Sequence, residues 1–281
     1  MFSNANSFKA KIKNISKDKG IPAQQVQQHY LIEQVLKLIS TSSYRDSFIV
    51  KGGYLIGQMI GLDKRTTMDL DVTLKGTEMS RENLIHIFEE ILCYKTDGFS
   101  FSVDKLEPIR QDDEYGGFRI AIECKLDNIR QIILLDIATG DPITPKEIVY
   151  KYKSTFEDKI YEIYTYNIET ILAEKIQTIY QRGVFNTRSK DFYDVYILFH
   201  LKKKEIDYEK LGVACRNTFN HRSNKFNVAD ILNLLDTLKG EKDMLKYWDN
   251  YQDRFRYAKN ISFHEVIDTI TELMVNLIEY D

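Results

Sequence analysis

Hydrophobic and polar positions follow two different periods in the first 165 residues of the chain. Phe8, Ile12 and Ile15 repeat at helical spacing ahead of Gly20, and a second helical pattern covers residues 23–39. Shorter helices are expected at 54–60 and 81–93. Alternating or continuously apolar patterns, which are typical of β-strands, occupy residues 48–50, 66–74, 99–106, 116–126 and 129–138. This part of the chain is therefore predicted to combine helices with a sheet.

From residue 166 onward the pattern is that of one helix after another. Residues that commonly cap helix N-termini precede the apolar stripes, namely Asn167, Ser189, Asp207, Asn227 and Ser262. Ser262 and Glu265 also have the spacing of a capping box. We therefore predict an α+β fold, with a mixed-sheet domain flanked by helices at residues 1–165 and an α-helical bundle domain at residues 166–281.

Composition and length narrow the class of protein. The 281 residues are 43% hydrophobic and 29% charged, which is the balance of a globular protein large enough for two domains. No apolar run reaches the roughly 18 residues that cross a bilayer. The lysine-rich start does not have the pattern of a signal peptide, so we expect a cytoplasmic protein without a membrane partner. Cys93, Cys124 and Cys215 lack metal-ligand spacing and receive no role.

The charge distribution bears on a nucleic-acid partner. The formal net charge of −3 provides no overall basic field, so such a partner would need local patches. Two lysine-rich patches exist, although runs of this kind are often only solvated surface. They consist of Lys9, Lys11, Lys13, Lys17 and Lys19, and of Lys202, Lys203 and Lys204.

Two aspartates separated by one leucine stand in the strand expected at 66–74. Because alternate strand residues share a face, Arg65, Thr67, Asp69 and Asp71 should lie together, opposite the apolar residues between them. Two adjacent carboxylates are unfavourable unless a cation lies between them, and their oxygens suit a hard divalent cation. The alternative is a solvent-facing edge with ordinary surface aspartates.

Gly52 and Gly53 follow an apolar strand pattern and lead into a helical one. Without a Cβ, the backbone N–H groups at such a helix N-terminus can approach phosphate oxygens. A glycine pair alone usually marks only a turn. Its short distance from the two aspartates indicates a site for a nucleoside triphosphate (NTP) with Mg²⁺ or Mn²⁺.

A third carboxylate is expected at such a metal site. Asp136 is the candidate, because it ends the apolar run IILLD, where a buried aspartate without a cation would be costly. Glu123 competes for this position. Asp141 fits turn chemistry better.

A lysine interrupts the apolar stripe of the helix expected from Ile168 onward. Lys175 there must extend to solvent, form an ion pair or bind an anion. Asp191 and Asp194 on the next helix are possible partners, so a purely structural ion pair is the competing interpretation.

Three segments carry a family resemblance, and the chain between residues 48 and 200 contains all of them in order. They are KGGYLIGQMIGLDKRTTMDLD, LLDIATGDPITP and IETILAEKIQTIYQRGVFNTRSKDFYDVYIL. This chain resembles the AbiEii/AbiGii toxin family of nucleotidyltransferases, which occurs in bacterial abortive-infection and toxin–antitoxin systems. The resemblance implies a core like that of the DNA polymerase β nucleotidyltransferases with a helical domain appended.

The resemblance also implies residue roles. Gly52 and Gly53 would lie at the nucleotide phosphates. Arg65 and Thr67, on the face that they share with the aspartates, are expected as further nucleotide contacts independently of the resemblance. Magnesium would be held by Asp69, Asp71 and Asp136. Lys175 would act toward the nucleotide, and Asp191 would match the family's later essential aspartate. Two departures are Tyr54, where a serine usually follows the glycine, and Lys190, where many members have arginine.

The expected function is a magnesium-dependent nucleotidyltransferase toxin that moves a nucleoside monophosphate from an NTP to an acceptor. Some relatives modify the 3′ end of transfer RNA, which favours RNA as the acceptor and a role in phage defence. Transfer to a small molecule or a protein hydroxyl is the alternative, as is a non-catalytic module that senses NTP and binds RNA or protein. An antitoxin is expected to be encoded nearby, without a stable complex.

Overall fold

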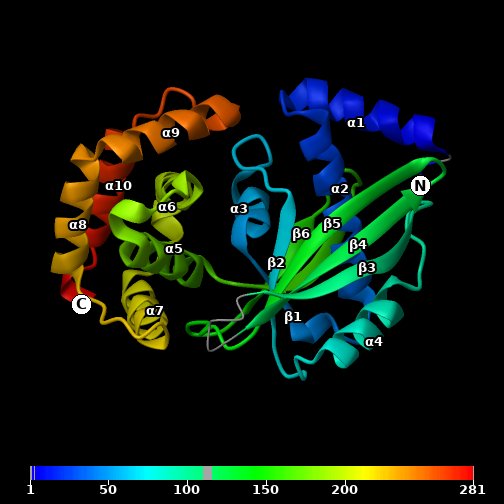
Figure 1. The fold of residues 1–281 in the computed structure, drawn as a ribbon, viewed down its shortest axis with the longest axis horizontal. Helices are drawn as coiled ribbons and strands as arrows, with labels where there is room; N and C mark the ends of the chain where they lie inside the picture. The colour runs from blue at the N-terminus through cyan, green and yellow to red at the C-terminus, as the bar shows by residue number, and fades with distance from the viewer. Residues whose placement is uncertain (1, 3, 110–115, 281) are drawn as a thin grey trace. The chain divides into compact units, whose positions relative to one another are not determined.

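A computed structural model of the chain describes residues 2, 4–109 and 116–280 (Figure 1). The chain divides into two compact units. The first comprises Met1–Gly140 and Ile148–Thr165, and the second comprises Asp141–Glu147 and Tyr166–Asp281. Asp141–Glu147 belongs with the helices because Asn167 Nδ2 donates to the Thr144 carbonyl at 2.8 Å, and the Thr144 N–H donates to Thr170 Oγ1 at 3.0 Å.

The first unit is built on a seven-stranded sheet with the order β3-β4-β5-β2-β1-β7-β6. The β2–β5 and β1–β7 pairs are parallel and the other pairs are antiparallel, so the predicted mixed sheet is confirmed. The strands are β1 (Phe48–Lys51), β2 (Asp69–Leu74), β3 (Ser100–Ile109), β4 (Gly117–Leu126), β5 (Ile129–Ala138), β6 (Ile148–Lys153) and β7 (Ile160–Thr165).

The last two strands were missing from the sequence prediction. β6 is an edge strand whose only fully buried side chain is Tyr152, so it lacks the apolar alternation that marks a strand with a buried face. β7 has buried side chains only at Ile163 and Thr165. β2 also begins later than expected, at Asp69 rather than near residue 66.

Among the described residues of this unit, the α-helices are α1 (Ala5–Lys19), α2 (Ala23–Thr41), α3 (Gly52–Ile60) and α4 (Arg81–Leu92). α2 packs on β5 and β7, and α4 packs on β3. α3 connects β1 to β2 along the chain and packs against both strands. It begins at Gly52, two residues before the start expected from the sequence. The apolar face of β2 is fully buried, with Leu70 and Val72 both 0% exposed.

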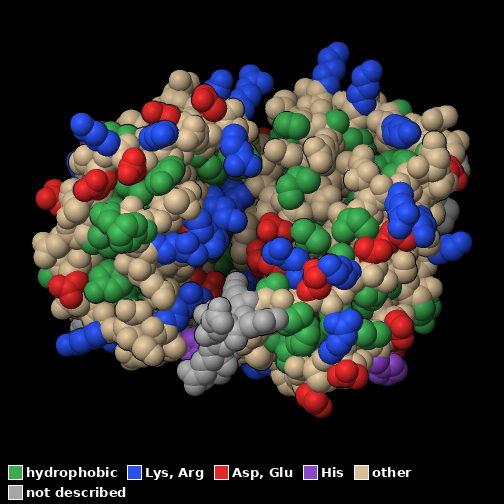
Figure 2. Space-filling view, viewed as in Figure 1, with side chains coloured by type: hydrophobic (Ala, Val, Ile, Leu, Met, Phe, Trp, Pro, Cys, Tyr) green, Lys and Arg blue, Asp and Glu red, His purple; other side chains and the backbone are tan. Residues whose placement is uncertain are grey.

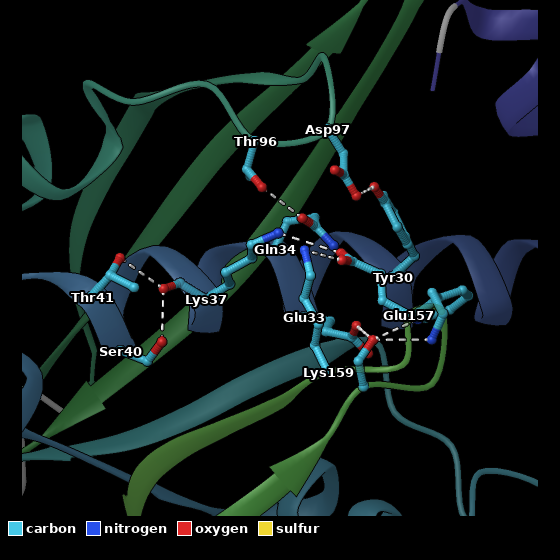
Figure 3. A network of polar contacts seen from close by, with 12 residues as sticks. Tyr30, Glu33, Gln34, Lys37, Ser40, Thr41, Thr96, Asp97, Glu157 and Lys159 are labelled. Atoms are coloured by element: carbon cyan, nitrogen blue, oxygen red, sulfur yellow. Dashed lines mark hydrogen bonds and ion pairs between the residues drawn. The ribbon is translucent and has the colours of Figure 1, made fainter. Parts of the chain in front are cut away.

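Polar side chains of α2 fasten two loops to this helix (Figure 3). The Tyr30 hydroxyl donates to Asp97 at 3.0 Å, and Lys37 Nζ lies 3.3 Å from Glu157 Oε1. Glu33 is 1% exposed and accepts the Tyr152 hydroxyl at 2.6 Å. Burial raises the pKa of the Glu33 carboxyl, because its charged form is poorly solvated there. The hairpin formed by β6 and β7 is thereby anchored on α2.

The second unit is helical, as predicted. The helices are α5 (Ile168–Arg182), α6 (Ser189–Lys202), α7 (Tyr208–His221), α8 (Val228–Gly240), α9 (Lys242–Arg254) and α10 (Phe263–Val275). Among the helices that the structure describes, none combines the length and apolar character needed to span a membrane.

Four of the five predicted caps are confirmed, since Asn167, Asp207, Asn227 and Ser262 each accept a backbone N–H three residues on. The prediction for Ser189 is wrong. Arg188 precedes α6 and Ser189 is its first residue. Asn186 Oδ1 accepts the Arg188 N–H at 2.9 Å, so the turn ahead of α6 is organised by Asn186 instead.

Candidate active site

Asp69 and Asp71 begin β2 and share one face of it. Both are half-buried, whereas Leu70 and Val72 on the opposite face are buried. The two carboxylates therefore have the predicted orientation, with the apolar residues of the strand packed into the core.

The register of the sheet aligns charged residues across four adjacent strands. Asp71 of β2 lies opposite Asp136 of β5 on one side and opposite Lys51 of β1 on the other. Asp136 in turn lies opposite Arg119 of β4. Directly opposed residues project from the same face of a sheet. Two acidic side chains are thus flanked by two basic ones on a single line across the sheet.

Arg119 binds Asp136 through a two-pronged contact. Its Nε donates to Oδ1 and its Nη2 donates to Oδ2, both at 2.7 Å. The pKa of the Arg119 guanidinium is raised, first by this hydrogen bond and then by the negative charges of Asp136, Asp69 and Asp71. The charge of Arg119 is therefore stabilised by all three carboxylates that were predicted from the sequence as metal ligands. The sequence prediction missed it, although a lone cation within the apolar stretch FRIAI was a usable signal.

The two competing carboxylates lie elsewhere. Glu123 is opposite Ile132, four residues from Arg119 along β4, and forms ion pairs with Lys125 and Arg130. Asp141 belongs to the second unit, where its Oδ1 is 3.8 Å from Arg222 Nη2. Asp136 is thus the carboxylate adjacent to Asp71, so the geometry favours it over Glu123.

Gly52 brings the start of α3 against Asp71. Its φ of +71° lies in the left-handed region, and a Cβ added there would come within 2.8 Å of Asp71 Cγ. A Cβ on Gly53 would be 2.8 Å from Arg65 Nη2. Both glycines therefore permit close approaches that a side chain would block.

Two further candidates lie in the segment before β2. Thr67 Oγ1 donates to Oδ1 of Asp69, a predicted metal ligand. Arg65 is 4% exposed and its guanidinium donates to the Thr66 carbonyl. This arginine is therefore held inside the first unit, beside Gly53.

The donor set has the chemistry of a divalent-cation site. Asp69, Asp71 and Asp136 supply carboxylate oxygens, which are the ligands that Mg²⁺ and Mn²⁺ prefer. Within the described residues, no three His, Cys, Asp or Glu side chains converge as a ready metal-ligand group. Arg119 holds both oxygens of Asp136. The residue types and their register fit a divalent cation, with Asp136 engaged by an arginine.

A second charged cluster lies within the helical unit. Lys175 Nζ of α5 is 2.7 Å from Asp191 Oδ1 and 3.0 Å from Asp194 Oδ2, both on α6. Arg188 Nε is 3.0 Å from Asp191 Oδ2. The side chains of Asp191 and Asp194 are 1% and 0% exposed, and that of Lys175 is 13% exposed. The ion pair considered from the sequence is present and includes both aspartates.

Most of the chain matches the model of a known protein family. A model of the family described as nucleotidyl transferase AbiEii toxin, type IV toxin–antitoxin system, matches residues 34–269. Two solved structures are similar at 17% sequence identity, and each covers 92% of this chain. One is a protein from H. pylori provisionally described as a nucleotidyltransferase (TM-score 0.47, 94% of that chain), and the other is JHP933 from Helicobacter pylori (TM-score 0.45, 91% of that chain). No curated protein matches the chain.

Proposed function

The chain belongs to the AbiEii nucleotidyltransferase toxin family of type IV toxin–antitoxin systems, and on this premise we propose a magnesium-dependent transfer of a nucleoside monophosphate from an NTP to RNA. The register that pairs Asp71 with Asp136 beside Gly52 is the observation that carries the proposal. It provides carboxylate oxygens for a divalent cation next to a helix N-terminus that suits phosphate.

In the proposed reaction, an acceptor hydroxyl oxygen attacks the α-phosphorus of the NTP. The bond from that phosphorus to the oxygen bridging to the β-phosphate breaks, and pyrophosphate leaves. Asp69, Asp71 and Asp136 would hold the cation, which when bound neutralises phosphate charge and favours loss of the hydroxyl proton. The backbone N–H groups at the start of α3 would orient the phosphates. Asp136 would accept that proton from the acceptor hydroxyl and pass it to water.

Lys175 and Asp191 are proposed as further parts of the machinery. The family resemblance assigns them toward the nucleotide, and the partly exposed Lys175 ammonium has the charge to stabilise a phosphate. Asp191 would fix its position through the 2.7 Å contact. Asp194 makes a similar contact, at 3.0 Å, and would share this orienting role.

RNA, at the 3′ end of a transfer RNA, is the acceptor we propose. In a chain of net charge −3, an RNA backbone needs a local basic surface, and Figure 2 shows Lys and Arg side chains gathered over the helical unit on the viewed face. The protein would act in the cytoplasm in phage defence. A type IV antitoxin would counteract it without forming a stable complex.

The test measures pyrophosphate release from each NTP, with and without total cellular RNA, in Mg²⁺ and after chelation. We expect RNA- and metal-dependent release, with label from α-³²P-NTP recovered in RNA. Asp71→Asn should lower the rate by about 10³-fold, since several kcal/mol of charge stabilisation depend on the cation. Asp104→Asn, which changes an exposed aspartate of the same unit, is the control.

Release that requires no RNA would redirect the proposal to a small molecule or a protein hydroxyl. If no NTP gave pyrophosphate with any acceptor, and label merely bound, the protein would be an NTP-sensing module.

A further inference from the structure

Arg119 has no part in the proposed transfer, yet it contacts the acidic cluster of Asp69, Asp71 and Asp136 through a two-pronged pair with Asp136. Its guanidinium donates to both oxygens of Asp136, and the negative charges of Asp69 and Asp71 also act on it. It lies at one end of the charged line across β4, β5, β2 and β1, and Lys51 lies at the other end.

We infer that Arg119 is a built-in counter-ion that competes with the divalent cation for Asp136, so that metal loading requires the arginine to give up at least part of its contact. This inference rests on the proposed function, because it concerns the same cation site.

The competition follows from the geometry of the contact. A two-pronged arginine pair engages both oxygens of a carboxylate and fixes its plane. A cation that binds the same oxygens approaches the positive guanidinium. Each of the two charges lowers the other's affinity for Asp136. Arg119 is thus a positioning residue in the absence of metal and a competitor in its presence.

The balance of charges leads to coupling with the nucleotide. Asp71 and Asp136 are offset by Lys51 and Arg119, which leaves one net negative charge from Asp69 among these five side chains. A divalent cation alone therefore gains little electrostatic binding free energy from these five side chains. A triphosphate adds several negative charges, so cation and NTP should bind much more tightly together than separately.

The experiment titrates Mn²⁺ into the full chain and follows the unbound ion by electron paramagnetic resonance, with and without a non-hydrolysable NTP analogue. Arg119→Met and Arg119→Gln remove the charge and should each raise Mn²⁺ affinity without nucleotide by about tenfold or more. Two such variants are used because the glutamine retains a hydrogen-bond donor. Both should reduce the gain in Mn²⁺ affinity that the nucleotide provides.

Arg119→Lys is the matched control. It keeps the charge and loses the two-pronged geometry, so its Mn²⁺ affinity should stay within about threefold of wild type. Circular dichroism verifies that each variant is folded, which the 41% exposed Arg119 side chain favours.

The inference is overturned if folded Arg119→Met and Arg119→Gln bind Mn²⁺ no more tightly than wild type. Equal gains in the lysine variant would also overturn it, since charge would then not be the cause. Failure of the proposed function looks different: wild type would bind no Mn²⁺ with or without the analogue, or Asp71→Asn would bind it as well as wild type.

Discussion

Two groups of charged side chains combine paired aspartates with basic residues but differ in burial. The sheet cluster consists of Asp69, Asp71, Asp136, Arg119 and Lys51, and the helical cluster consists of Lys175, Asp191, Asp194 and Arg188. On the sheet, the side chains of Asp136 and Arg119 are 14% and 41% exposed. Between α5 and α6, Asp191 and Asp194 are almost completely buried around Lys175. A partly exposed carboxylate can replace one partner by water or by a cation at lower cost than a completely buried one can.

This difference separates two uses of the same residue types. The sheet cluster is suited to exchanging ligands, as a metal-dependent site must. The helical cluster is suited to holding a fixed geometry, because loss of a member weakens the compensation of charges that are buried there. A lysine in the second cluster can therefore serve both the fold and the chemistry.

The largest expected effect is that of Lys175→Met. It leaves two buried carboxylates without their shared cation, so the free energy of unfolding should fall by about 3–5 kcal/mol. Urea denaturation measures the change. Lys210→Met is the control, because Lys210 and its partner Asp207 have side chains 54% and 41% exposed, and its loss should cost under about 1 kcal/mol.

The same variant tests the proposed role of Lys175 in transfer. After correction for the folded fraction, the rate should still be lower by about 10²-fold. A rate that merely follows the folded fraction would make the helical cluster structural only. If the free energy of unfolding fell by less than about 1 kcal/mol, the conclusion that the buried helical cluster is costly to break would be wrong.

Gly52→Ala should have an intermediate effect, centred on the sheet cluster. The left-handed φ alone costs about 1–3 kcal/mol, and the new Cβ would also push against Asp71. Thermal unfolding and NTP transfer are the measurements. Gly76→Ala is the control, because Gly76 has φ +69° but nothing within 4 Å of an added Cβ. If Gly52→Ala and Gly76→Ala changed the transfer rate equally, the close contact between Gly52 and Asp71 would have no role in transfer.

The smallest effect is expected for Asn167→Ala, at the start of the helix that carries Lys175. Loss of a cap costs about 0.5–2 kcal/mol, and the upper end applies because Asn167 also donates to the Thr144 carbonyl. Asn227→Ala, which removes the cap of α8, should lie near the lower end. Chemical denaturation of both variants compares them. A smaller loss at Asn167 than at Asn227 would contradict the tie between Asp141–Glu147 and α5.

Local patterns explain which features were predictable from the sequence. The period of two in MDLDVTL was enough to put Asp69 and Asp71 on one face and Leu70 on the other. Cap residues such as Asn167 and Asp207 were recognisable because a cap bonds to a backbone only three residues away. β6 escaped prediction because an exposed edge strand has little apolar periodicity.

The sequence by itself determined the succession of a mixed sheet and a helical part, the paired aspartates and the glycine turn, because each depends on neighbours within a few residues. Only the tertiary structure decided that Asp136, rather than Glu123, lies beside Asp71, and that Arg119 binds it. Those choices depend on the register between strands that are far apart in the chain. A shift of one residue would turn each of these side chains to the opposite face, and register is set by packing of the whole sheet rather than by any one segment.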